Sequence, residues 1–213
     1  MPRILRLAIQ ECEKPLPKAK AARGSFGDIF HGCFALGSEA ADVRLDVSKW
    51  DTMVGEYPRM EDVDVIALTG SYYTAFQNDP WIVALADFVK HALHSIDKKV
   101  FGICFGHQVI GRALGAEVNR NPHGWELSVE SVSLNEQGQE LLGLPSVKLH
   151  QMHRDAVLTV PPGIANLGSS PKCPVQILYQ PGRLLSFQGH PEFDKFTNEE
   201  IIRADGKIGH AIF

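Results

Sequence analysis

The sequence lacks several features that would place a protein in a specialised class. No apolar run reaches the roughly 18 residues that a membrane-spanning helix requires. Lys and Arg number 21 against 25 Asp and Glu, and the net charge of -4 provides no electrostatic footprint for nucleic acid or an acidic membrane. The four cysteines are scattered and form no C-x-x-C pair, so no disulfide scaffold is predicted; they are Cys12, Cys33, Cys104 and Cys173.

We expect neither a secretory leader nor a division of the sequence into separate domains. Its first residues, MPRILRLAIQE, reach the charged Glu11 before the apolar region of a signal peptide could form. We therefore expect a cytoplasmic protein with reduced thiols. No internal repeat, low-complexity tract or linker interrupts the chain, and 213 residues suit one large domain. We predict a single domain over residues 1–213.

The first half alternates predicted strands and helices. Apolar runs predict strands at Leu5–Gln10, Val63–Leu68 and Lys99–Ile103, and alternation of apolar and polar residues predicts one at Val43–Val47. Periodic segments predict helices at Ser25–Leu36, Pro80–His94 and Phe105–Leu114, with Ser25 and Asp79 as N-caps and Gly37 closing the first helix. The segment Glu11–Gly24, with two prolines and several basic residues, predicts a surface loop.

The second half is richer in short strands. They are predicted at Ala116–Arg120, Trp125–Ser133, Val147–His150, Ala156–Val160, Val175–Tyr179 and Leu184–Gln188, with helices around Gln137–Leu142 and at Phe196–Ala204. A βαβα order followed by a strand-rich half predicts an α/β fold. We expect a mainly parallel sheet with helices on both faces, extended by antiparallel strands.

One cysteine lies in a distinctive turn. The predicted strand Lys99–Ile103 ends within the segment Gly102-Ile103-Cys104-Phe105-Gly106, and the predicted helix Phe105–Leu114 follows at once. This is the pattern of a nucleophile elbow, in which small flanking residues permit a tight turn. The helix N-terminus would stabilise a thiolate, and the Phe105 N–H would point to a developing oxyanion. The alternative is a buried core cysteine between two glycines.

A candidate base follows the last predicted strand. His190 lies in Gly189-His190-Pro191-Glu192, directly after Leu184–Gln188. A histidine at one strand end can reach the end of a neighbouring parallel strand, and Glu192 can accept its second N–H. Cys104, His190 and Glu192 would then act as nucleophile, base and orienting carboxylate. The alternative for His190 is a capping or hydrogen-bonded histidine.

These two segments resemble the nucleophile and His-x-Glu motifs of class I glutamine amidotransferases, in the triad or peptidase C26-like group. The resemblance runs from the first strand to Glu192 and implies a flavodoxin-like fold, with the three roles as assigned. It implies a second oxyanion N–H at Gly70 or Ser71, in Leu68-Thr69-Gly70-Ser71-Tyr72. It also implies that Gln108 and the segment Gln151–Asp155, with His153 and Asp155, hold the amino-acid end of the substrate.

The remaining histidines give no strong metal signal. His91-x-x-His94 fits a solvated helix face. His150-x-x-His153 could contribute to a metal site, but no thiolate or carboxylate set in the sequence completes one. We predict no metal and no cofactor.

The resemblance implies hydrolysis of a γ-glutamyl amide through a thioester. The chain has no glycine-rich ATP loop, so it acts alone or donates ammonia to a separate synthetase subunit. The segment Asn121–Glu126, with Gly-Trp-Glu, resembles the stand-alone γ-glutamyl peptidase group, which we favour; the expected partner is a small γ-glutamyl substrate.

A third possibility is a catalytically impaired paralogue that serves as a binding module. Members of the group usually have a longer helical stretch after the His-x-Glu motif, and here Asp205–Gly209 resembles their closing segment.

Overall fold

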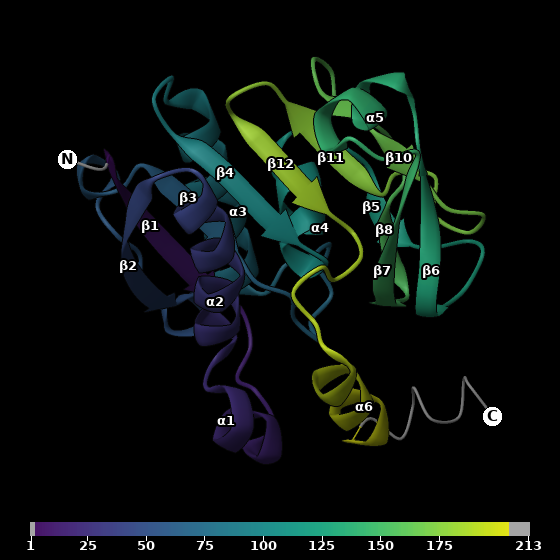
Figure 1. Cartoon of the computed structure of the whole chain (residues 1–213), viewed down its shortest axis with the longest axis horizontal. Helices are drawn as coiled ribbons and strands as arrows, with labels where there is room; N and C mark the ends of the chain where they lie inside the picture. The colour runs from purple at the N-terminus through teal and green to yellow at the C-terminus, as the bar shows by residue number, and fades with distance from the viewer. Residues whose placement is uncertain (1–2, 205–213) are drawn as a thin grey trace.

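A seven-stranded sheet forms the centre of the computed structural model, which describes residues 3–204. Its strand order is β2-β1-β3-β4-β12-β11-β9 (Figure 1). The strands are β1 (Arg3–Glu11), β2 (Val43–Asp51), β3 (Val65–Leu68), β4 (Lys99–Ile103), β9 (Ala165–Asn166), β11 (Ile177–Gln180) and β12 (Leu184–Phe187). The first five in this order are parallel, whereas β11 and β9 are antiparallel to their neighbours. The parallel part has the 2-1-3-4-5 order of flavodoxin-like folds, which confirms the predicted fold class.

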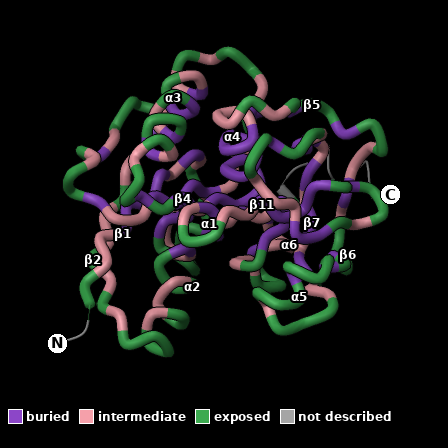
Figure 2. The backbone as a smooth tube through the Cα atoms, turned by 90° about the horizontal axis from the view of Figure 1, so that it is seen from above, coloured by how far each residue is buried: buried purple, intermediate pink, exposed green. Residues whose placement is uncertain are grey.

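Helices cover both faces of this sheet, as predicted. Figure 2 shows α3 (Pro80–His94) and α4 (Phe105–Ala113) on one side of the buried sheet and α2 (Phe26–Ala40) on the other. Strand residues alternate between the two cores because successive side chains point to opposite faces. In β1, Ala8 packs in the core beneath α3 and α4, whereas Leu7 and Ile9 pack with Phe30 of α2.

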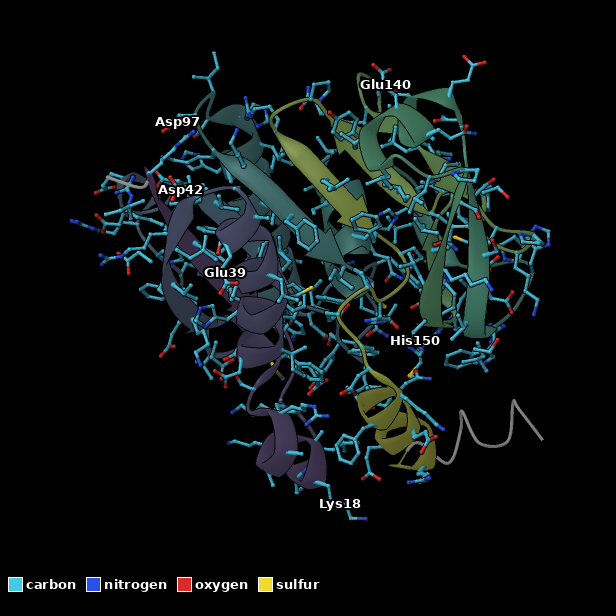
Figure 3. All side chains as sticks on the ribbon, in the orientation of Figure 1. Lys18, Glu39, Asp42, Asp97, Glu140 and His150 are labelled. Atoms are coloured by element: carbon cyan, nitrogen blue, oxygen red, sulfur yellow. The ribbon has the colours of Figure 1, made fainter. Side chains whose placement is uncertain are left out.

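A smaller antiparallel sheet follows α4 in the chain. It contains β10 (Gly168–Ser169), β6 (Glu126–Leu134) and β7 (Ser146–His153), with α5 (Glu136–Leu142) between β6 and β7, while β5 (Val118–Arg120) pairs with β8 (Asp155–Val157). The backbone N–H of His190 donates to the carbonyl of His150 at 2.8 Å. This bond ties the small sheet to the segment after β12, and Figure 3 shows His150 between the small sheet and the loop that leads to α6 (Lys195–Ala204).

The predicted surface loop Glu11–Gly24 was wrong, because it contains the helix α1 (Pro17–Arg23). Pro17 occupies the first turn, where proline is tolerated, and the Lys-Ala-Lys-Ala-Ala run has high helix propensity. The helix lies beside α6 (Figure 1), where Arg23 pairs with Asp194 at 2.7 Å. Two short 3-10 helices, η1 (Thr52–Val54) and η2 (Met60–Asp62), were also not predicted.

Most predicted boundaries differ by a few residues. The helix Pro80–His94 and the strand Lys99–Ile103 are confirmed, but Asp79 makes no side-chain hydrogen bond as an N-cap. Ser25 does cap α2, in a capping box with Asp28, although α2 continues past Gly37. The segment Asp205–Gly209 lies outside the described residues. No described helix has the length and apolarity needed to cross a membrane.

Candidate active site

Cys104 lies at the junction of β4 and α4 in a backbone conformation that L-residues rarely adopt. Its φ is 53° and its ψ is -105°, and α4 begins at the next residue. Such strain is typical of a nucleophile elbow. The turn requires its two glycines, because a Cβ on Gly102 would lie 2.8 Å from the Gly106 carbonyl carbon, and a Cβ on Gly106 would lie 2.6 Å from the Leu68 oxygen.

Two backbone segments converge on the nucleophile from different strands. The Phe105 N–H is at the start of α4, where the first N–H groups have no acceptor within the helix. The Phe105 ring is buried and stacks on Trp81 with centroids 5.6 Å apart, so this residue is anchored away from solvent. A Cβ on Gly70 would lie 3.0 Å from His190 Cε1 and 3.8 Å from Cys104 Cβ. The Gly70-Ser71 turn therefore lies against the reactive groups, where a second oxyanion donor is needed.

His190 and Glu192 form a buried pair beside Cys104. The His190 Nδ1 donates to Glu192 Oε1 at 2.8 Å, since a carboxylate only accepts. This bond leaves Nε2 for the Cys104 sulfur, with which His190 also interacts. The imidazole lies flat on the Phe193 ring, with centroids 4.0 Å apart and an interplanar angle of 9°. The orientation of the imidazole is thus fixed by Glu192 at its edge and by Phe193 at one face.

The charges of this group are strongly coupled. Burial alone would lower the pKa of His190, but the Glu192 carboxylate and the Cys104 thiolate outweigh it and raise this pKa to about 10. At neutral pH the ring is therefore an imidazolium. It can protonate a leaving amine, and its positive charge beside the Cys104 sulfur favours the thiolate form that acts as nucleophile.

A buried neutral histidine connects the nucleophile helix to the strand that leads to His190. His107 on α4 hydrogen-bonds through Nδ1 to the Ser186 hydroxyl of β12 at 2.9 Å. Burial, together with the positive charge of His153, lowers the pKa of His107 to about 3. The bond therefore joins α4 to β12 without adding a charge.

A cavity of about 720 Å³ lies in front of Cys104. Of the residues predicted for the site, Gly70, Ser71, Cys104, Gln108, His153, Asp155, His190 and Glu192 line it. Gln108 uses both amide hydrogens inside the protein, donating to the Asp155 carbonyl at 2.9 Å and to Gln188 Oε1 at 3.2 Å. Its own carbonyl oxygen is the atom left for a ligand.

Asp155 presents a carboxylate to the same cavity. It accepts from Arg120 at 2.8 Å and interacts with Thr74. Burial raises the pKa of Asp155, whereas Arg120 and Thr74 act in the opposite direction. The carboxylate is thus partly desolvated, as a ligand for a substrate ammonium should be.

His153 lines the cavity, but its ring nitrogens have partners within the protein. Both of its ring nitrogens are used inside the protein, Nδ1 with the Asp155 carbonyl at 3.0 Å and Nε2 with Glu126 Oε2 at 2.8 Å. Glu126, His153 and Cys173 have potential metal-ligating atoms within 4.8 Å of one another, a set that the spacing of His150 and His153 did not reveal. The Glu126 oxygens already accept from neighbouring donors, and the Cys173 thiol donates to the Val175 carbonyl at 3.5 Å. The cluster is therefore satisfied by hydrogen bonds.

Several residues of the cavity were missed at the sequence level. They include Glu13, Phe26, Tyr73, Thr74 and Arg120. Arg120 and Thr74 come from separate strands and loops and share no local motif, so only their common contact with Asp155 identifies them. Trp125 and Glu126 were singled out only through the Gly-Trp-Glu resemblance.

Comparison with known proteins identifies a family for this chain. The family described as Glutamine amidotransferase class-I matches residues 29–206. The chain is 36% identical to a glutamine amidotransferase-like protein of Schizosaccharomyces pombe, over 92% of this chain and 83% of that protein. It is 32% identical to gamma-glutamyl peptidase 2 of Arabidopsis thaliana, over 96% of this chain and 83% of that protein.

A solved structure supports the same assignment at the level of the fold. The crystal structure of a glutamine amidotransferase from Thermotoga maritima matches with a TM-score of 0.74 at 20% identity, and covers 95% of this chain and 83% of that one. The family match spans most of the sequence and includes both Cys104 and the His190-x-Glu192 segment. This chain is therefore a member of the class I glutamine amidotransferase family.

Proposed function

We propose that this protein is a stand-alone hydrolase of γ-glutamyl amide bonds that works through a thioester on Cys104. The observation that carries the proposal is the strained Cys104 backbone beside a His190 imidazolium that Glu192 holds at 2.8 Å. Nucleophile, acid-base group and orienting carboxylate are thus within reach of one another, as covalent acyl transfer requires. A cytoplasmic location suits this chemistry, because the sulfur must stay reduced, and all four cysteines are free.

The reaction begins when the Cys104 thiolate attacks the γ-carbonyl carbon of the substrate. The carbonyl oxygen becomes an oxyanion, which the Phe105 N–H and an N–H of the Gly70-Ser71 turn stabilise. His190 donates its Nε2 proton to the leaving nitrogen, the C–N bond breaks, and a thioester remains. Water then attacks the thioester while the neutral His190 takes up its proton, and glutamate leaves as the thiolate and imidazolium are restored.

The substrate's amino-acid end has partners in the cavity. We assign the α-ammonium group to the Asp155 carboxylate and the Gln108 carbonyl oxygen, since both are acceptors that line the cavity. Buried polar groups discriminate strongly against an analogue that leaves them unpaired.

The leaving side has room for more than ammonia. Cavities of about 300–1,000 Å³ hold drug-sized ligands, and this one measures about 720 Å³. A relative at 32% identity bears the name gamma-glutamyl peptidase, which supports a γ-glutamyl conjugate as the substrate. We therefore expect tolerance beyond the scissile bond and little tolerance before it.

A glutamate-release assay tests the proposal. The purified protein is given glutamine, glutathione, an S-substituted glutathione and the α-deamino analogue of glutamine, with Cys104→Ala as the control. Release from the conjugates, and none from the deamino analogue or from Cys104→Ala, is the expected result. If free glutamine is hydrolysed far better than every conjugate, the protein is instead a glutaminase subunit that supplies ammonia to a separate synthetase, and the proposal of a stand-alone enzyme is wrong. If no compound is hydrolysed, the binding-module alternative replaces both.

A further inference from the structure

A buried charged pair lies at the edge of the cavity, where His153 lines it and Glu126 lies behind His153. Glu126 and His153 face each other across the antiparallel strands β6 and β7, and only 2% and 3% of their surfaces are exposed. Glu126 Oε2 and His153 Nε2 are 2.8 Å apart. A buried ion pair is costly unless its remaining hydrogen-bonding capacity is satisfied, so its other contacts determine what it does.

The hydrogen-bond pattern defines the charge of each partner. The two nitrogens of His153 face acceptors, the Glu126 carboxylate and the Asp155 carbonyl, so both nitrogens must donate and the ring is an imidazolium. Burial opposes ionisation of Glu126, but hydrogen bonds from His153, Ser170 and Gln176 outweigh it and lower the pKa of Glu126. The pair is therefore carboxylate and imidazolium.

The Asp155 carbonyl connects this pair to the nucleophile helix. Its oxygen accepts from His153 Nδ1 at 3.0 Å and from Gln108 Nε2 at 2.9 Å. Gln108 stands on α4, four residues after Cys104, and Asp155 begins β8. One carbonyl oxygen thus fixes both the Gln108 amide and the backbone that carries the Asp155 carboxylate.

We infer that Glu126 is a positioning residue for the γ-glutamyl end of the substrate: its carboxylate keeps His153 doubly protonated, and His153 then holds Asp155 and Gln108 in their binding geometry. Glu126 itself does not line the cavity. Glu126 Oε2 accepts from both His153 Nε2 and Gln176 Nε2, so in a neutral amide at this position the carbonyl oxygen takes that place. A neutral oxygen supports the second proton of His153 less well than a carboxylate does. A His153 that keeps only its Nε2 proton turns a lone pair toward the Asp155 carbonyl, and the shared carbonyl contact is lost or rearranged. The inference rests on the proposed function for the identity of the ligand.

The test replaces the carboxylate by its neutral isostere, Glu126→Gln. Glu130→Gln is the matched control, because Glu130 lies on the same strand and contacts only Ser128 through its side chain among the described hydrogen bonds. For each protein, kcat and KM are measured with a γ-glutamyl substrate. The rate of Cys104 alkylation by iodoacetamide is measured as well, with and without L-glutamate as a protecting ligand.

For Glu126→Gln we expect a rise of about tenfold or more in KM and in the glutamate concentration that protects Cys104, as the loss of one charged buried hydrogen bond would give. The unprotected alkylation rate should stay near that of the unmodified protein, because none of the described hydrogen bonds or ion pairs joins Glu126 to Cys104 or His190. Glu130→Gln should change none of these values. His153→Gln should have the same effect as Glu126→Gln, and the double variant should cost no more than either single one.

Three results would overturn the inference. The first is Glu126→Gln with unchanged KM and protection. The second is a slowed unprotected alkylation, which would indicate general damage to the fold, and the third is additive costs in the double variant. The protection assay needs no turnover, so it separates this inference from the proposed function. If glutamate protects Cys104 of the unmodified protein but the protein hydrolyses no amide, the proposed function alone is contradicted. If glutamate does not protect Cys104 of the unmodified protein, the inference is contradicted.

Discussion

The backbone N–H of Cys104 donates to the carbonyl of Phe187 at 2.8 Å, so the nucleophile is joined by its main chain to the strand that leads to His190. Phe187 is the last residue of β12, which lies parallel to β4 in a register that pairs Phe187 with Ile103. Both strands therefore end at the same level, and the residues beyond them meet. The distance between nucleophile and base is therefore set by the hydrogen-bond ladder between two central strands of the sheet.

Replacing the two partners of Cys104 should have unequal effects. We predict that His190→Ala abolishes γ-glutamyl hydrolysis, whereas Glu192→Ala leaves a measurable residual activity. The reason is that His190 transfers protons, whereas Glu192 only orients and polarises His190. Loss of a general acid-base group typically costs about 10²–10⁴-fold in rate. Initial rates of glutamate release measure both, and His91→Ala on the exposed surface of α3 is the control. Wild-type activity in His190→Ala would remove the triad from the mechanism.

The raised pKa of His190 predicts where activity falls at high pH. Protonation of the leaving amine needs the imidazolium, which persists until the pH passes its folded-state pKa of about 10. Any stability that the imidazolium adds is fully present below its unfolded pKa of about 6.5, and is lost as the pH rises through about 10. The alkaline limb of kcat/KM should therefore lie near pH 10.

In Glu192→Gln this limb should move to lower pH by about one unit or more, because one of the two anions that raise the pKa of His190 is gone. A pH–rate profile of both proteins measures the shift. An alkaline limb at the same pH in Glu192→Gln would show that Glu192 does not set the charge of His190.

The sequence predicted the parts of the site that depend on short segments. The elbow Gly102–Gly106 and the pair His190 and Glu192 are each local, and the parallel order of β4 and β12 brings them together. The pairing of Glu126 with His153 was not predictable, because it depends on the register of β6 against β7. The helix α1 was missed because Pro15 and Pro17 indicate a loop, although Pro17 occupies the first turn and the following Lys-Ala-Lys-Ala-Ala run favours a helix. A seven-residue helix is marginal by itself, and α1 lies against α6 in the folded protein, which a local pattern does not reveal.

The four thiols should differ sharply in reactivity. Cys12 and Cys173 are fully buried, and burial is the main cause that raises the pKa of each to about 12, so neither is a nucleophile in the folded protein. Cys33 is exposed on α2, but partial burial raises its pKa too, and it lies near the Glu192 charge. We predict that iodoacetamide at neutral pH modifies Cys104 first, even though Cys33 is more exposed.

Peptide mapping at limiting reagent measures this order, and Cys33→Ser is the control. A glutamine-mimicking electrophile should modify Cys104 alone. Preferential labelling of Cys33 by both reagents would mean that the elbow does not activate its cysteine.

Two helical glycines form a matched pair for testing the packing at the elbow. Gly106 in the first turn of α4 and Gly32 in α2 have ordinary helical backbones, but a Cβ on Gly32 meets nothing within 4 Å. Gly32→Ala should therefore leave activity unchanged and stabilise the protein by about 0.5–1 kcal/mol, because alanine is the better helix former. A Cβ on Gly106 would instead lie 2.6 Å from the Leu68 carbonyl oxygen, which is backbone and cannot rotate away.

Gly106→Ala should therefore destabilise the protein by about 1–3 kcal/mol, the usual cost of overpacking. Leu68 ends β3 two residues before Gly70, so relief of the clash moves α4 away from the strand that carries the second oxyanion segment. The Phe105 N–H and the Gly70-Ser71 turn would separate, and kcat should fall more than KM rises, because an oxyanion hole acts on the transition state. Chemical denaturation and steady-state kinetics of the two variants measure both effects. Equal stability and equal kcat for Gly106→Ala and Gly32→Ala would show that close packing of α4 on β3 does not hold the oxyanion donors in place.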